Sequence, residues 1–89
     1  MFDFKRTGNL VTVTTRGDAR LNPTSEFFKI GTVGNDFKPS STVTAPMTWG
    51  SFANVTGLVR IETNGDIKIY ASSAQSNVQG WCNFSYFVT

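Results

Sequence analysis

Histidine is absent from this 89-residue chain, and cysteine occurs once, at Cys82. Without histidine the chain lacks the commonest general base and the commonest metal ligand. A single cysteine excludes an internal disulfide and has no histidine to activate it as a nucleophile. We therefore interpret Cys82 as a small buried apolar residue. These absences predict a protein that is not an enzyme and that needs no metal or other cofactor.

Charge is also scarce: eight Lys and Arg stand against six Asp and Glu, and together they make up 16% of the chain. The basic residues are scattered, so the sequence has no nucleic-acid footprint. No apolar run approaches the roughly 18 residues of a membrane helix. The N-terminal stretch also lacks the apolar segment of a signal peptide. We expect neither nucleic-acid binding nor membrane insertion.

The chain is rich in aromatic residues, with eight Phe, two Tyr and two Trp, and it holds eight Gly. Helix-forming residues never cluster at helical spacing, so the composition is that of an all-β protein. We expect a single domain over 1–89, folded as a small antiparallel two-sheet sandwich that resembles a jelly roll. A domain this small buries only about 60–65% of the surface of its unfolded chain. Assembly into an oligomer would therefore add useful burial.

Alternating apolar residues and turn signals predict seven or eight short strands, over 2–5, 11–14, 27–30, 42–45, 47–55, 58–62, 66–71 and 81–88. Pro46 is expected to end the strand before it, because proline cannot donate a ladder hydrogen bond. Residues 18–25 and 72–80 are expected to be loops. The 81–88 strand has apolar side chains on both faces, which predicts a central strand covered on both sides.

The clearest local signal is the hairpin over 58–71, which turns at Asn64 and Gly65. A two-residue loop would place apolar residues opposite charged ones on both faces. A three-residue loop over 63–65 pairs Ile61 with Ile67 and gives Gly65 the left-handed position. A loop over 64–66 suits the charges better but places the glycine in its middle. We favour the loop over 63–65, which sets Arg60 opposite Lys68.

Aromatic residues are the candidates for contact with a ligand or another subunit. Tyr70 interrupts the polar face of the hairpin between Arg60 and Lys68, so we expect these three residues to contact a ligand or another subunit. Trp49 and Trp81 are further candidates, because an indole can stack on the apolar C–H face of a sugar. The alternative interpretation is that most of the Trp and Phe residues form the core.

Five segments in order resemble one family: "FKRTGNLVTVT" at 4–14, "FFKIGTV" at 27–33, "FKPSSTVTAPM" at 37–47, "GLVRIETNGDIKIY" at 57–70 and "WCNFSYFV" at 81–88. Together they are similar to the C-terminal domains of tail-fibre and baseplate proteins of phages and prophages of Gram-positive bacteria. The chain departs from the family pattern at 34–36, where Gly-Asn-Asp replaces Pro-Gly. No binding residue is carried over from the family.

The resemblance implies a virion structural protein, of which 1–89 is the C-terminal part, facing the host surface from the tail or baseplate. It implies a homotrimer that binds a host cell-wall saccharide or docks another phage tail protein. From a different class, the chain would be a carbohydrate-binding module of a cell-wall hydrolase. A glycosidase is a third and weaker reading, because no two carboxylates are adjacent in the sequence.

Overall fold

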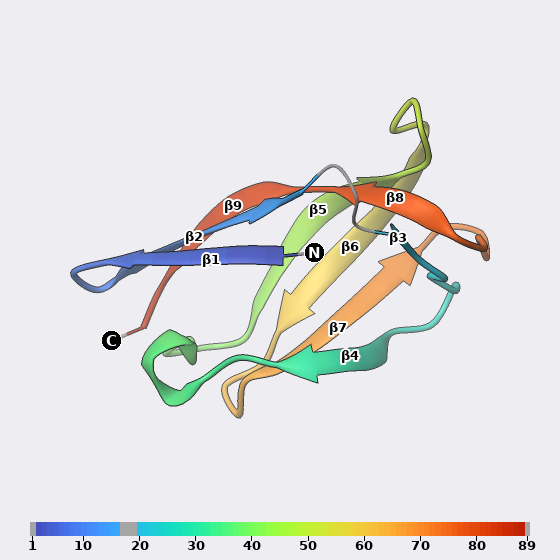
Figure 1. The fold of residues 1–89 in the computed structure, drawn as a ribbon. Coiled ribbons are helices and arrows are strands. Elements are labelled where there is room, and N and C mark those ends of the chain that lie inside the picture. The colour runs from blue at the N-terminus through green and yellow to red at the C-terminus, as the bar shows by residue number, and fades with distance from the viewer. Residues whose placement is uncertain (1, 17–19, 89) are drawn as a thin grey trace.

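The structure is a computed structural model that describes residues 2–16 and 20–88. These residues form nine strands and a short 3-10 turn (Figure 1). The elements are β1 (Phe2–Thr7), β2 (Leu10–Thr15), β3 (Arg20–Leu21), β4 (Phe28–Thr32), η1 (Asn35–Phe37), β5 (Val43–Trp49), β6 (Val55–Ile61), β7 (Asp66–Ala71), β8 (Val78–Trp81) and β9 (Asn83–Phe87).

The strands make two antiparallel sheets, one of three strands in the order β1-β2-β9 and one of six in the order β3-β8-β5-β6-β7-β4. The pairings are nested: β2 pairs with β9, β3 with β8, β4 with β7 and β5 with β6. A long hairpin rolled up on itself produces this nesting, which is the connectivity of a jelly roll. The predicted fold class, a small antiparallel two-sheet sandwich, is confirmed.

The core lies between the sheets as two adjoining clusters. The larger cluster comes from the six-stranded sheet and contains Ala45, Met47, Trp49, Val59, Ile67, Ile69 and Ala71. The smaller joins the two sheets and contains Val11, Val13, Ile61 and Tyr86. Half-buried aromatic residues, among them Phe2, Phe4 and Phe84, pack against both clusters. The inward residues of alternating strands therefore build one continuous interior.

Two predictions around Pro46 are wrong. Strand β5 runs through Pro46 to Trp49, and the chain then turns through residues 50–54, where a separate strand over 47–55 was expected. Proline is tolerated because the neighbour on that side, β8, pairs with β5 only at Thr48 and Trp49. The edge of β5 beside Pro46 is thus open, and proline is compatible with an open edge.

The predicted strand over 81–88 is divided at Cys82 between the two sheets. Strand β8 is internal, between β3 and β5, whereas β9 lies at the edge of the three-stranded sheet. The alternation was predicted correctly, since Phe84 and Tyr86 point inward while Ser85 and Phe87 are exposed. The expectation of a central strand is wrong for β9, which is an edge strand. Within the described chain its inner face packs on the core and its outer face is exposed, so cover on that face stays a prediction.

The segment before β4 also departs from the predicted loop over 18–25. Of that loop, residues 18 and 19 lie outside the described residues. Arg20 and Leu21 form the short strand β3, which pairs with β8. Pro23 is fully buried, and its carbonyl accepts a hydrogen bond from the backbone N–H of Gln75 at 2.9 Å. The loop is therefore packed against the β7–β8 connection.

Candidate functional site

The hairpin of β6 and β7 has the favoured register. Ile61 pairs with Ile67 and Val59 with Ile69, and all four side chains are buried. Gly65 has a φ of +96°, a conformation that suits glycine. Its backbone N–H donates to the carbonyl of Glu62 at 2.8 Å, which closes the turn. The alternative loop over 64–66 is therefore excluded.

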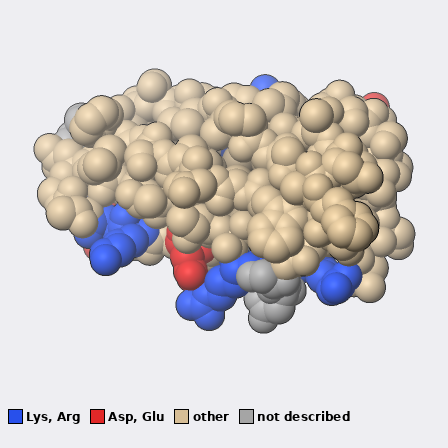
Figure 2. Space-filling model, turned by 90° about the horizontal axis from the view of Figure 1, so that it is seen from above, with Lys and Arg blue, Asp and Glu red and all other residues tan. Residues whose placement is uncertain are grey.

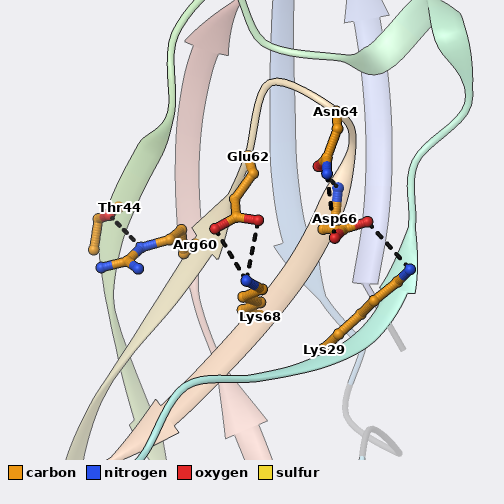
Figure 3. Close-up of polar contacts among 7 residues, drawn as sticks. All are labelled: Lys29, Thr44, Arg60, Glu62, Asn64, Asp66 and Lys68. Carbon is orange, nitrogen blue, oxygen red and sulfur yellow. Dashed lines mark hydrogen bonds and ion pairs between the residues drawn. The ribbon is translucent and has the colours of Figure 1, made fainter.

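The opposed cations on the outer face are neutralised along diagonals (Figure 3). Lys68 and Arg60 are direct partners, and Lys29 lies opposite Lys68 on its other side. Lys68 Nζ lies 3.1 Å from a carboxylate oxygen of Glu62, and Lys29 Nζ lies 3.2 Å from Oδ1 of Asp66. A row of three cations thus borders a row of two acids, and each lysine has its own carboxylate.

Arg60 has no carboxylate partner among the described residues. Its Nε donates to Thr44 Oγ1 at 3.3 Å, and its guanidinium carbon lies 4.0 Å from the centroid of the Phe27 ring. The Phe27 ring also packs on Tyr70, with 5.3 Å between ring centroids. Cation–π and aromatic packing therefore hold Arg60 and Tyr70 on the sheet surface. The structure brings three predicted contact residues, Arg60, Lys68 and Tyr70, onto one face.

Trp49 is fully buried, so it has no surface for a ligand or another subunit and is dropped from the candidates. Its Nε1 donates to the carbonyl oxygen of Tyr70 at 3.0 Å. Two glycines on the neighbouring strands make room for the indole. A Cβ at Gly57 would lie 2.7 Å from Trp49 Cδ1, and one at Gly80 would lie 2.7 Å from Trp49 Cζ3. Trp49 is a core residue.

Trp81 is 37% exposed and points outward from β8, where its cross-strand partner is Thr48 of β5. Trp81 begins a row of outward residues that continues along β9. The outward residues of β2 lie beside this row on the same surface. We call this surface the uncharged face; its residues are Leu10, Thr12, Thr14, Trp81, Asn83, Ser85 and Phe87. Figure 2, seen from the side of β8 and β9, shows a broad area with Lys, Arg, Asp and Glu at its margins.

Two further groups, Tyr86 and Cys82, lie inside. Tyr86 donates its hydroxyl to the carbonyl oxygen of Phe37 at 2.5 Å, and burial raises its pKa to about 12. Cys82 is half-buried and packs against both core clusters, and burial raises the pKa of its thiol to about 12. A thiol with so high a pKa is almost wholly protonated at neutral pH, as expected of a structural cysteine.

Sequence reasoning missed three residues that shape these surfaces. Phe27 was assigned to a strand, but it precedes β4 and packs on the outer face of the hairpin. Phe87 is 63% exposed, and Phe52, in the β5–β6 loop, is 89% exposed. The alternation over 81–88 carried the signal for Phe87, because it shares a face with Asn83 and Ser85. No comparable signal marks Phe52.

No pocket and no group of potential metal ligands is found among residues 2–16 and 20–88. None of the described segments forms a helix that is long and apolar enough to cross a membrane. A scan against protein-family models finds no match to the chain, and a search of the curated proteins finds none either.

Proposed function

We propose that the chain is a structural domain of a phage or prophage tail fibre or baseplate that acts in host adhesion. In this role it forms a homotrimer on the virion and either binds a host cell-wall saccharide or docks a receptor-binding protein. Two things support the proposal: the resemblance carried by five segments in order, and a rolled β-sandwich of the class that the resemblance implies. The proposed role requires no catalysis.

The observation that carries the proposal is the uncharged face. Among the described residues, the large hydrophobic side chains with the greatest exposure are Leu10, Phe52, Trp81 and Phe87. Three of them belong to this face, and the fourth lies in the loop next to Trp81. Exposed apolar areas of this kind mark sites where a protein contacts another molecule. A domain that works inside a larger assembly buries such a surface when it assembles.

Trp81 favours a second candidate, a carbohydrate-binding module of a cell-wall hydrolase. Its indole stands in one row with Asn83 and Ser85, which are uncharged and exposed. An aromatic ring beside neutral hydrogen-bonding groups suits a sugar, which offers both an apolar face and hydroxyl groups.

Native mass spectrometry together with binding to purified cell-wall polysaccharide separates these functions. A trimer that binds the polysaccharide supports the adhesin. A trimer that binds a purified tail protein but no polysaccharide supports the docking role. A monomer that binds polysaccharide supports the hydrolase module. A monomer that binds neither overturns the proposal.

A further inference from the structure

We propose that the uncharged face is the surface on which a second copy of this chain docks. The inference rests on the proposed function, since it assigns the subunit interface of the proposed trimer. It leaves the outer face of β4, β6 and β7, with Arg60, Lys68 and Tyr70, free for a ligand or another tail protein. Four properties of the face favour a second copy as the occupant. They are its exposed apolar side chains, the hydrogen bonds its polar groups already make, its lack of charge and its area.

The apolar part of the face is a connected series of side chains. Leu10 and Phe87 are direct cross-strand partners on β2 and β9. They are 38% and 63% exposed. Trp81 continues the row along the chain, and its Nε1 donates to the carbonyl of Gly50 at 2.9 Å. Gly50 begins the loop that carries Phe52, so this bond links the face to the most exposed aromatic residue of the described chain. Phe and Trp are enriched in the cores of interfaces.

Some polar groups of the face already form hydrogen bonds within the chain. The only hydrogen-bond donor of the Trp81 side chain is already used within the chain. The hydroxyl oxygens of Thr12 and Ser85 lie 3.3 Å apart and bond to each other across the strands. A protein partner can therefore cover the indole N–H and the bond between the two hydroxyls without breaking either, whereas each buried donor left unpaired would cost about 1–3 kcal/mol. A saccharide would instead have to compete for the same hydroxyls.

The two broad sides of the sandwich differ in the number of charged residues that they carry. In a symmetric trimer, residues close to the threefold axis lie next to their own copies in the other subunits, so a charge there meets like charges. Like charges placed against each other cost several kcal/mol. The uncharged face itself has none. Charges lie along its border, where Asp3 and Lys5 on β1 are the cross-strand partners of Thr14 and Thr12. Arg16, paired with Asp3, and Arg20 on β3 extend this border. The opposite side carries the cation row of Lys29, Arg60 and Lys68.

The size of the molecule sets how much of the face must be used. The described chain extends 34 × 23 × 17 Å, so a broad face measures roughly 800 Å² as a rectangle. A stable interface of standard size buries about 800 Å² on each partner. A subunit of a trimer contacts two neighbours, so assembly has to use at least the whole of a broad face. This requirement favours the side on which the charges lie at the margin (Figure 2).

Substitutions on the two sides test the assignment. Phe87→Asp places a charge at the most exposed residue of the face, and Leu10→Asp does the same at its cross-strand partner. Lys29→Asp is the control, because Lys29 is exposed on β4, which lies at the other end of the six-stranded sheet from β3 and β8. Light scattering after size exclusion gives the mass, and far-UV circular dichroism checks the fold.

We expect a wild-type trimer of 9.8 kDa chains. Each uncharged-face variant should raise the dissociation constant for assembly by at least about tenfold while the chain stays folded. Lys29→Asp should leave the trimer intact. If Phe87→Asp does not fold, the mass of Leu10→Asp tests the same interface. A monomeric wild type, a trimer that survives both uncharged-face substitutions, or a trimer that only Lys29→Asp dissociates would each overturn the inference.

Binding to purified cell-wall polysaccharide, measured on the same samples, keeps the two proposals apart. If the trimer dissociates as expected but the chain binds neither polysaccharide nor tail protein, the interface stands and the proposed function fails. If a monomeric wild type binds polysaccharide and Phe87→Asp abolishes that binding, the saccharide is the occupant of the face and the inference is overturned.

Discussion

Gly57→Ala should strongly destabilise the domain, because the buried indole of Trp49 lies directly over Gly57. An added Cβ would lie 2.7 Å from Trp49 Cδ1 and would also clash with the carbonyl oxygen of Tyr70. That oxygen accepts the Trp49 indole hydrogen bond, so both partners have to move. Overpacking a core costs about 1–3 kcal/mol, and an unpaired buried polar group costs about 1–3 kcal/mol more.

A total loss of about 3 kcal/mol is a large share of the 5–15 kcal/mol that stabilises a typical domain. At about 4–8 °C for each kcal/mol, the melting temperature should fall by roughly 12–24 °C. Thermal unfolding followed by far-UV circular dichroism measures this change. The protein concentration must be held constant, since assembly makes the melting temperature depend on it.

Gly34→Ala is the matched control for this prediction. A Cβ at Gly34 meets nothing within 4 Å, and its φ of −67° is accessible to alanine. That variant should be as stable as the wild type or slightly more so. Introducing Gly57→Ala into a Trp49→Phe background should cost less, because the crowded indole atoms are gone and only the clash with the Tyr70 carbonyl remains. Equal costs in the two backgrounds, or a Gly57→Ala melting temperature that matches the control, would refute the reasoning.

Three further predictions concern turns, charge and pH. Gly65→Ala should cost about 1–3 kcal/mol, because its φ of +96° is strained for alanine and the Cβ would press on neighbouring atoms. Gly8→Ala, with φ +62° and open space around it, should cost about 1–2 kcal/mol in a denaturant titration, and a larger loss at Gly8 than at Gly65 would contradict this account. A double-mutant cycle on Glu62 and Lys68 should give a coupling of about 0.2–1 kcal/mol, weakened by salt, and no coupling at low salt would show that the pair contributes nothing. The raised pKa of Tyr86 means that the folded state holds its proton longer than the unfolded state, so the free energy of unfolding should fall as pH rises from about 10 to about 12. Tyr86→Phe should be less stable than the wild type at neutral pH by about 1 kcal/mol and should show a shallower alkaline decline, whereas an unchanged decline would mean that other groups cause it.

Local patterns in the sequence were enough to predict the hairpin of β6 and β7 and its register. The period of two along a strand ties each residue to one face, so a wrong register would have placed charges in the core. The turn residues then chose between the remaining loops, because Gly65 can adopt a positive φ at little cost. The same periodicity separated Phe84 and Tyr86 from Ser85 and Phe87.

Tertiary structure decided which aromatic residues are buried. Trp49 and Trp81 both stand in strand-like segments beside a glycine, and nothing in their neighbourhood distinguishes them. Trp49 is buried because Gly57 and Gly80, on the two strands that flank β5, leave space for its indole. This arrangement depends on pairings between segments that are distant in the sequence.

For the candidate surfaces too, the sequence predicted one part and the tertiary structure decided the other. Alternation placed Arg60, Lys68 and Tyr70 on one face without any structure. The packing of Phe27 over that face, and the alignment of Leu10 with Phe87 on the other, required the rolled pairing of β4 with β7 and of β2 with β9. Local chemistry assigns a side chain to a face, but only long-range pairing determines what lies across from it and whether it stays exposed.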